Sequence, residues 1–126
     1  VDHAKVVAED ALIESFVIGN LGKNVIEAVH GVVDVKEKRS FGIIETFTAA
    51  SAIRAADAAV KSGYIELIEV RVARGMAGKC FVSMTGDVSD VRAAVEAGAR
   101  IAADEGVLIN TEVIANPHEE LWNAIL

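Results

Sequence analysis

The residues with the clearest chemical potential lie at positions 74–79, which read Arg-Gly-Met-Ala-Gly-Lys. Arg74 and Lys79 place two cations in a segment that contains no acid. Gly75 and Gly78 permit positive φ angles and close approach of the backbone to another group. Such a segment could offer positive charge and backbone N–H groups to an anion, or it could be an ordinary surface turn. Both interpretations stay open on these six residues alone.

A phosphate-binding P-loop is the first specific chemistry to consider for this segment. That motif needs four residues between its glycines, a Ser or Thr after the lysine, and then a helix. Here two residues separate Gly75 from Gly78, Cys80 follows Lys79, and an apolar stretch typical of a strand comes next. A charged hairpin loop is therefore the better interpretation.

Nucleophilic or metal chemistry would have to come from the few cysteine and histidine side chains. Cys80, His118 and Asp87 could form a nucleophilic set, but a lone cysteine on an apolar strand is more often a small core residue. His3, His30 and His118 have no partner at a ligand spacing such as HxxxH or CxxC. We therefore predict no catalytic, cofactor-binding or metal site, and a protein that is not an enzyme. An oxidoreductase or electron carrier using Cys80 is the less favoured alternative.

The composition narrows the class of protein. A chain of 126 residues is long enough for one domain with a real core but hardly for two. An apolar fraction of 52% beside a net charge of −7 favours a protein that covers apolar surface in an oligomer, and argues against nucleic acid as a partner. No apolar run approaches the roughly 20 residues that span a bilayer, so we predict no membrane partner. A single cysteine excludes an internal disulfide and suits a reducing cytoplasm.

Hydrophobic periodicity predicts the elements that position the loop. From residue 41 onward they are a strand at 41–46, a helix at 49–61, strands at 65–72 and 80–85, a helix at 90–105, a strand at 107–114 and a short helix at 119–125. Thr48 or Ser51 could cap the first helix and Ser89 the second. The order β-α-β-β-α-β is a split βαβ arrangement, which predicts an α/β (α+β) fold with a ferredoxin-like sheet and helices on one face.

The beginning of the chain resembles its end. Before residue 41 we predict a helix at 1–11, a strand at 12–18, a turn at 19–22, a helix at 23–29 and a polar linker at 32–40. Residues 11–20 lie over 107–116 at a constant offset of 96 with five identities, for example Leu12 with Leu108 and Asn20 with Asn116. This repeat indicates that residues 1–31 are the C-terminal part of a first domain and that residues 41–126 are a complete second copy.

Four motifs carry a resemblance to a known family. Residues 42–46, 55–62, 86–91 and 114–118 resemble the bacterial microcompartment (BMC) shell domain, in the family's order, and they cover nearly all of 41–122. Within the family, the chain is most similar to the tandem-domain, trimeric shell proteins of the propanediol-utilisation type. The Gly-Lys-Cys-Phe run at 78–81 and the Pro-His-Glu…Trp ending at 117–122 resemble the second domain of that subgroup.

The resemblance implies a structural tile rather than a catalyst. In this family three tandem chains, or six single-domain chains, pack into a flat hexagonal disc, and discs tile edge to edge into a shell around metabolic enzymes in the cytoplasm. The implied partners are therefore copies of the same chain and other shell proteins.

The resemblance also implies two sets of site residues. Those of the axial pore loop are Arg74, Gly75, Met76, Ala77, Gly78 and Lys79. Those of the tile edge are Lys61, Asn116, Pro117 and His118. A ring of cations about an axis selects by sign, so the pore would favour anionic metabolites. In the opposing interpretation Lys79 points into bulk solvent and Arg74 pairs with an acid such as Glu69.

Two departures from the family pattern qualify these expectations. The opening elements of a first domain are missing, including the loop that holds a 4Fe-4S cluster in the subgroup, so we predict no cofactor here and an N-terminally truncated tandem protein. A circularly permuted, single-domain hexameric shell protein is the first alternative, since residues 11–31 could be a permuted element. A ferredoxin-like domain that binds a small regulatory ligand in the glycine loop is an alternative of a different class.

Overall fold

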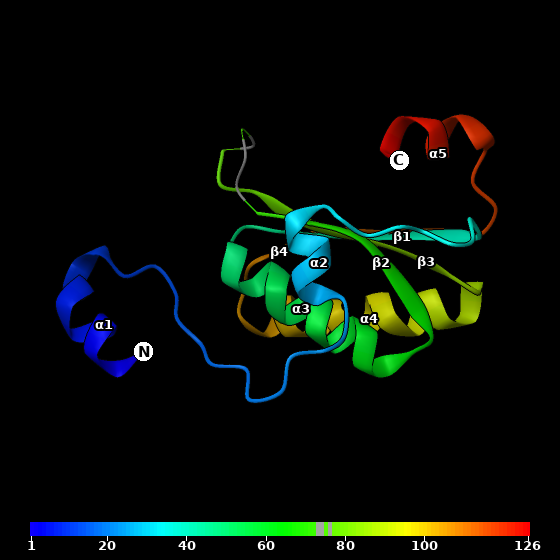
Figure 1. Ribbon diagram of the computed structural model, residues 1–126. Helices are drawn as coiled ribbons and strands as arrows, with labels where there is room; N and C mark the ends of the chain where they lie inside the picture. Colours follow the sequence, from blue (N-terminus) through cyan, green and yellow to red (C-terminus); the bar gives the residue numbers. More distant parts are fainter. Residues whose placement is uncertain (73–74, 76) are drawn as a thin grey trace.

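The computed structural model describes residues 1–72, 75 and 77–126, and within them a four-stranded sheet carries the fold (Figure 1). The strands are β1 (Ser40–Thr46), β2 (Ile65–Arg71), β3 (Cys80–Gly86) and β4 (Leu108–Ile114). The helices are α1 (Asp2–Ala8) with a short 3₁₀ turn (Glu9–Ala11), α2 (Val25–His30), α3 (Ala49–Ser62), α4 (Val88–Asp104) and α5 (Glu119–Ile125).

The strand order β2-β3-β1-β4 confirms the predicted split βαβ arrangement. β3 lies antiparallel between β1 and β2, and β1 lies antiparallel between β3 and β4. Each of the two long helices therefore joins parallel strands that are separated by one strand. In Figure 1, α3 and α4 cover one face of the sheet, and α5 lies over the other.

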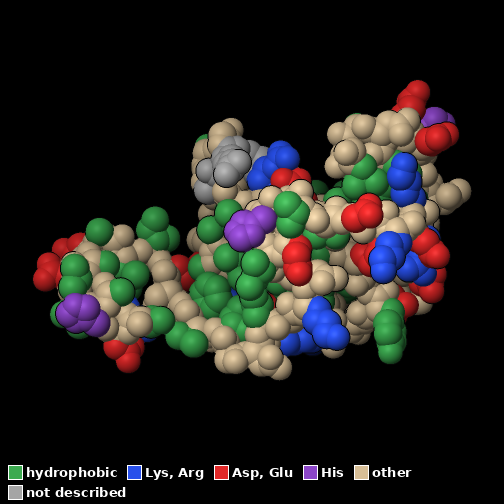
Figure 2. All heavy atoms as spheres, in the orientation of Figure 1, with side chains coloured by type: hydrophobic (Ala, Val, Ile, Leu, Met, Phe, Trp, Pro, Cys, Tyr) green, Lys and Arg blue, Asp and Glu red, His purple; other side chains and the backbone are tan. Residues whose placement is uncertain are grey.

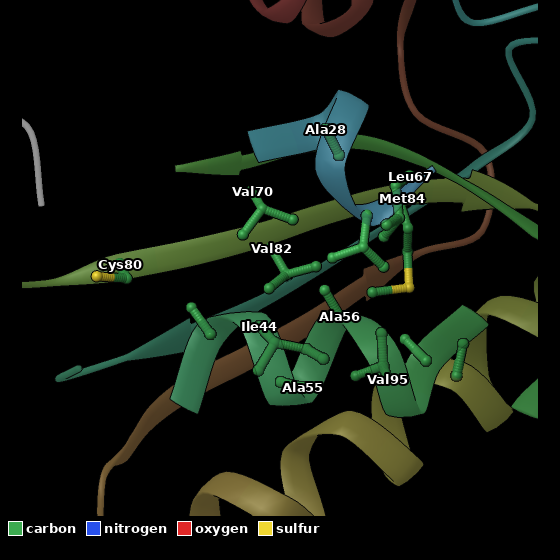
Figure 3. Close-up of a cluster of buried hydrophobic side chains, with 14 of the residues drawn as sticks. Ala28, Ile44, Ala55, Ala56, Leu67, Val70, Cys80, Val82, Met84 and Val95 are labelled. Carbon is green, nitrogen blue, oxygen red and sulfur yellow. The ribbon is translucent and has the colours of Figure 1, made fainter. Parts of the chain in front are cut away.

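The core fills the space between the sheet and the two long helices (Figure 3). Ile44 and Met84 from the strands are fully buried against Ala55 and Ala56 of α3. Small side chains allow the two helices to approach closely. A Cβ on Gly98 of α4 would stand 2.7 Å from the carbonyl oxygen of Ala55 and 2.6 Å from Cδ1 of Ile44. The alanine-rich sequence of α3 and Gly98 together set the separation of the helices.

A second, smaller cluster holds α5 on the opposite face. Trp122 of α5 and Phe41 of β1 are both buried, and their ring centroids lie 6.1 Å apart in an edge-to-face arrangement. This geometry is the one that aromatic pairs prefer. Ile68 of β2 completes the cluster, so the C-terminal helix is attached to both the centre and the edge of the sheet.

The predicted strand at 12–18 is wrong. These residues are all described, and they form no strand but run as coil between the 3₁₀ turn and α2. A strand needs a neighbour for its N–H and C=O groups, and the edge of β1 that faces away from β3 is already paired with β4. Ile13 is 90% exposed, whereas Glu14 accepts a hydrogen bond from Thr48 Oγ1 at the start of α3 and the ring of Phe16 lies against Arg54 of that helix.

The predicted start of the second long helix is also wrong. Helix α4 begins at Val88 rather than at Asp90, because the N–H of Val91 already bonds the carbonyl oxygen of Asp87 at 2.9 Å. Ser89 therefore lies inside the helix and does not cap it. The side chain of Asp87 makes no cap hydrogen bond and instead accepts one from Arg39 Nη1 at 2.9 Å. At the other long helix the prediction is confirmed, since Thr48 caps α3 by accepting from the N–H of Ser51 at 3.1 Å.

Residues 1–18 form an arm that lies beside the folded body (Figure 1). None of the residues of α1 is buried, and Val6, Val7 and Val17 are each at least 70% exposed. Figure 2 shows hydrophobic side chains on the surface of this arm. Single exposed hydrophobic residues are ordinary, but several of them on one short arm make it a candidate interface with another chain. Of the helices in the described residues, none combines the length and apolarity required to traverse a bilayer.

Candidate functional site

The glycine-rich segment joins β2 to β3 as a hairpin, as predicted. Gly75 and Gly78 have φ angles of 69° and 86°, and Ala77 between them has a φ of 53°. Left-handed backbone is easy for glycine and strained for alanine, which explains why two glycines stand here. Gly75, Ala77, Gly78 and Lys79 are exposed. The predicted pore residues Arg74 and Met76 lie outside the described residues.

The charged side chains at the base of this hairpin are paired along β2. Arg71 Nε lies 2.9 Å from Glu69 Oε1, and the guanidinium lies 5.1 Å from the ring centroid of Phe81. Glu69 is the acid that pairs with Arg74 in the interpretation in which Arg74 is neutralised. In the structure Glu69 pairs with Arg71 on its own strand. Arg74 lies outside the described residues, so its pairing stays a prediction.

Cys80 is a core residue, as the sequence indicated. Its side chain is fully buried among the hydrophobic residues beneath the sheet. Its nearest polar partner is the carbonyl oxygen of Gly78, 3.6 Å from Sγ, which is a weak interaction for a thiol. Across residues 1–72, 75 and 77–126, no three His, Cys, Asp or Glu side chains are grouped to hold a metal ion.

Lys61, predicted at the tile edge, ends α3 and is held in a defined position. Its Nζ donates to Asp57 Oδ2 at 2.7 Å and to the carbonyl oxygen of Asn20 at 2.6 Å. Its side chain is 46% exposed, so the ammonium is both anchored and accessible. Beside it lies an open cleft of about 840 Å³ lined by the 20–24 turn, the end of α3, and Tyr64.

The other predicted edge residues lie elsewhere on the chain. Asn116 and Pro117 line a separate pocket with Lys38, Arg39 and Trp122. His118 caps α5, because its Nδ1 accepts from the N–H of Glu120 at 3.3 Å. Lys61 and the 116–118 turn thus lie in different pockets, and the described contacts do not bring them into one cluster.

The sequence reasoning missed Asp57, whose carboxylate joins Lys61 to the preceding segment. Asp57 Oδ1 accepts from the N–H of Gly22 at 2.7 Å. The spacing of Asp57 and Lys61 is i,i+4 on a helix, which is the spacing of favourable acid–base pairs. That spacing was visible in the sequence, whereas the contact with Gly22, 35 residues away, was not.

Comparison with known proteins places these features in context. Residues 40–117 match the family described as "BMC domain". The chain is 38% identical over 120 residues to the bacterial microcompartment shell protein PduT of Citrobacter freundii, a match that covers 95% of this chain and 65% of that protein. It is 38% identical over 82 residues to the shell protein EutM of Salmonella typhimurium, covering 65% of this chain and 83% of EutM.

A solved structure gives the same result in three dimensions. The crystal structure of a microcompartments protein from Desulfitobacterium hafniense DCB superposes with a TM-score of 0.88 at 37% identity. The superposition covers 98% of this chain and 68% of that chain. The chain thus spans about two thirds of the length of PduT and of this structural relative.

Proposed function

Because the chain belongs to the BMC-domain family, we propose that it is a structural subunit of a bacterial microcompartment shell in the cytoplasm. The observation that carries this proposal is the similarity to a shell protein over 95% of the chain. The exposed apolar arm and the 91% exposure of Tyr64 support assembly with further copies, because such surface is usually covered in an oligomer.

We further propose that residues 1–31 complete a first domain and that residues 41–126 form a second. The support is the repeat of residues 11–20 at 107–116. In the second copy this segment is β4, which pairs with β1. A strand of a first domain equivalent to β1 would give residues 12–18 the neighbour that they lack among the described residues. The proposed assembly is then a trimer that resembles a hexamer, and the hexamer of a permuted single-domain protein is the alternative.

Measuring the mass of the native particle beside electron microscopy of concentrated samples tests the shell role. We expect a trimer or hexamer in solution and flat sheets with hexagonal order at high protein concentration. The intact mass of the polypeptide identifies which chains compose each particle. A protein that stays monomeric at every concentration and forms no sheets, alone or with other shell proteins, would contradict the proposal.

We propose that the β2–β3 hairpin lines an axial pore that favours anions. The support is its exposed position, its left-handed glycines and the exposed Lys79, which a symmetry axis would repeat as a ring of charge. Backbone N–H groups beside Gly75 and Gly78 would add donors. Cys80 lies in the core behind this loop, so we assign it no part in a cofactor site.

Reversing the charge at Lys79 should change which solutes pass. In closed shells assembled with Lys79→Glu, we expect entry of a small anion to fall at least about tenfold relative to a neutral solute of the same size, since charged openings alter local ion concentration on this scale. Lys36→Glu makes the same charge change on an exposed residue in the segment before β1 and should leave the ratio unchanged. Equal ratios for Lys79→Glu and the parent protein would rule out charge selection by Lys79.

A further inference from the structure

The carboxylate of Asp57 connects two parts of the chain that the sequence keeps far apart. Oδ1 accepts from the backbone N–H of Gly22 and Oδ2 accepts from Lys61 Nζ, both at 2.7 Å. Lys61 Nζ also donates to the carbonyl oxygen of Asn20 at 2.6 Å. These three hydrogen bonds close a ring that joins the last turn of α3 to the 20–22 turn. The side chain of Asp57 is only 14% exposed, so water competes weakly for it.

The packing around Gly22 shows that this arrangement depends on close approach. A Cβ at position 22 would stand 2.3 Å from Cγ2 of Val60 and 3.3 Å from Asp57 Oδ1. Only glycine therefore lets the backbone N–H reach the carboxylate without displacing Val60. The residues before this turn also contact α3, nearer the start of the helix, where the Arg54 guanidinium lies 5.7 Å from the ring centroid of Phe16. The segment thus lies along α3 and reaches its end at Lys61.

We propose that Asp57 is a positioning residue for the edge-to-edge contact between neighbouring discs. This inference rests on the proposed shell function and on the placement of Lys61 at the disc edge. An ammonium group has three N–H donors, and two of them are occupied by Asp57 and Asn20. The remaining donor has a restricted direction, so Lys61 is held ready to bond one acceptor on the adjacent disc. Holding a long side chain in place beforehand reduces the ordering cost of that contact.

An ordinary surface ion pair is the competing explanation of the same geometry. Such i,i+4 pairs add little to helix stability, and loss of one would leave assembly unchanged. The two explanations differ in what Asp57→Asn does. In that variant the amide oxygen introduced at position 57 can still accept from the N–H of Gly22, whereas the charge opposite Lys61 is lost.

The test compares the protein concentration at which sheets first form for the parent protein, Asp57→Asn, Lys61→Ala and the double variant. Native mass measurement shows whether each variant still assembles into the disc. Amide hydrogen exchange measures the protection of the N–H of Gly22. We expect Asp57→Asn to raise the threshold concentration about three- to tenfold with the disc intact and Gly22 still protected. The double variant should match Lys61→Ala, because both substitutions act on one contact. Asp57→Ala should in addition speed exchange at Gly22.

The outcomes separate this inference from the proposed function. If Lys61→Ala raises the threshold and Asp57→Asn does not, Asp57 has no positioning role, although the shell function stands. The same conclusion follows if the effects of the two substitutions simply add. If Lys61→Ala leaves the threshold unchanged, Lys61 makes no edge contact, and the positioning role proposed for Asp57 is wrong as well. If Asp57→Ala leaves exchange at Gly22 unchanged, the ring of hydrogen bonds does not hold in solution.

Discussion

Replacing Ile44 with alanine is expected to lower the free energy of unfolding by about 2–5 kcal/mol. Ile44 is fully buried at the centre of the core. It lies on β1, opposite Val82 of β3 and Thr111 of β4, and its Cδ1 fills the space beside Gly98 where α3 and α4 approach. Removal of three carbon atoms leaves a cavity between backbone segments that cannot collapse easily. Denaturant unfolding at one fixed protein concentration measures the loss.

The matched control is Ile44→Val, which removes a single methyl group from the same site. Its expected cost is about 0.5–1.5 kcal/mol. Fixing the protein concentration matters, because association stabilises the folded state by mass action. A loss below about 1 kcal/mol for Ile44→Ala would mean that the site either collapses or admits water, and that the core is packed less tightly than the contacts of Ile44 indicate.

Replacing Lys61 with alanine is expected to raise the protein concentration needed for sheets by about ten- to a hundredfold, leaving the disc intact. A hydrogen bond from a charged group contributes about 1.5–3 kcal/mol, and each 1.4 kcal/mol is a tenfold change in an equilibrium constant. Since the Lys61 side chain is 46% exposed, its loss should change the free energy of unfolding by less than about 1 kcal/mol. Electron microscopy of a dilution series measures the threshold.

Lys36→Ala is the control for this experiment, since it also removes one surface cation. Lys36 lies in the segment before β1, and its described hydrogen bond uses the backbone N–H rather than the side chain. The control variant should form sheets at the concentration of the parent protein. Unchanged sheets in Lys61→Ala would show that this lysine lies away from the disc edge.

The order of the elements could be predicted because its signals are local. Thr48 accepts from an N–H three residues later, and this hydrogen bond fixes the start of α3. Gly31 ends α2 with a φ of 70°, and Gly75 and Gly78 turn the hairpin with positive φ. Each of these residues acts on its immediate neighbours, so one sequence is sufficient to predict its effect. The β-α-β-β-α-β order, and from it the split βαβ sheet, followed directly.

The wrong strand at 12–18 and the missed contact of Asp57 arose where structure depends on distant partners. Residues 12–18 (Leu-Ile-Glu-Ser-Phe-Val-Ile) are rich in the β-branched and aromatic side chains that strands favour, but such a composition supplies no neighbour for the backbone N–H and C=O groups. Segments 11–20 and 107–116 are similar enough to pair with the same kind of strand. The edge of β1 that faces away from β3 is already occupied by β4, so it cannot also pair with residues 12–18. Likewise the i,i+4 spacing of Asp57 and Lys61 was visible, but the link from Asp57 to Gly22 required the folded chain. The direction of the hairpin relative to a symmetry axis depends on other copies and stays a prediction.

The central place of β1 in the sheet has a consequence for biosynthesis. Its two neighbours, β3 and β4, lie downstream in the chain, and the second of them ends at Ile114, 68 residues after Thr46. At about 5–20 residues per second, a ribosome needs roughly 3–14 s to supply that stretch. For the first 40 residues of this stretch β1 lacks both neighbours, and until its end β1 still lacks β4, which is the condition that invites misassembly between growing chains and engages chaperones.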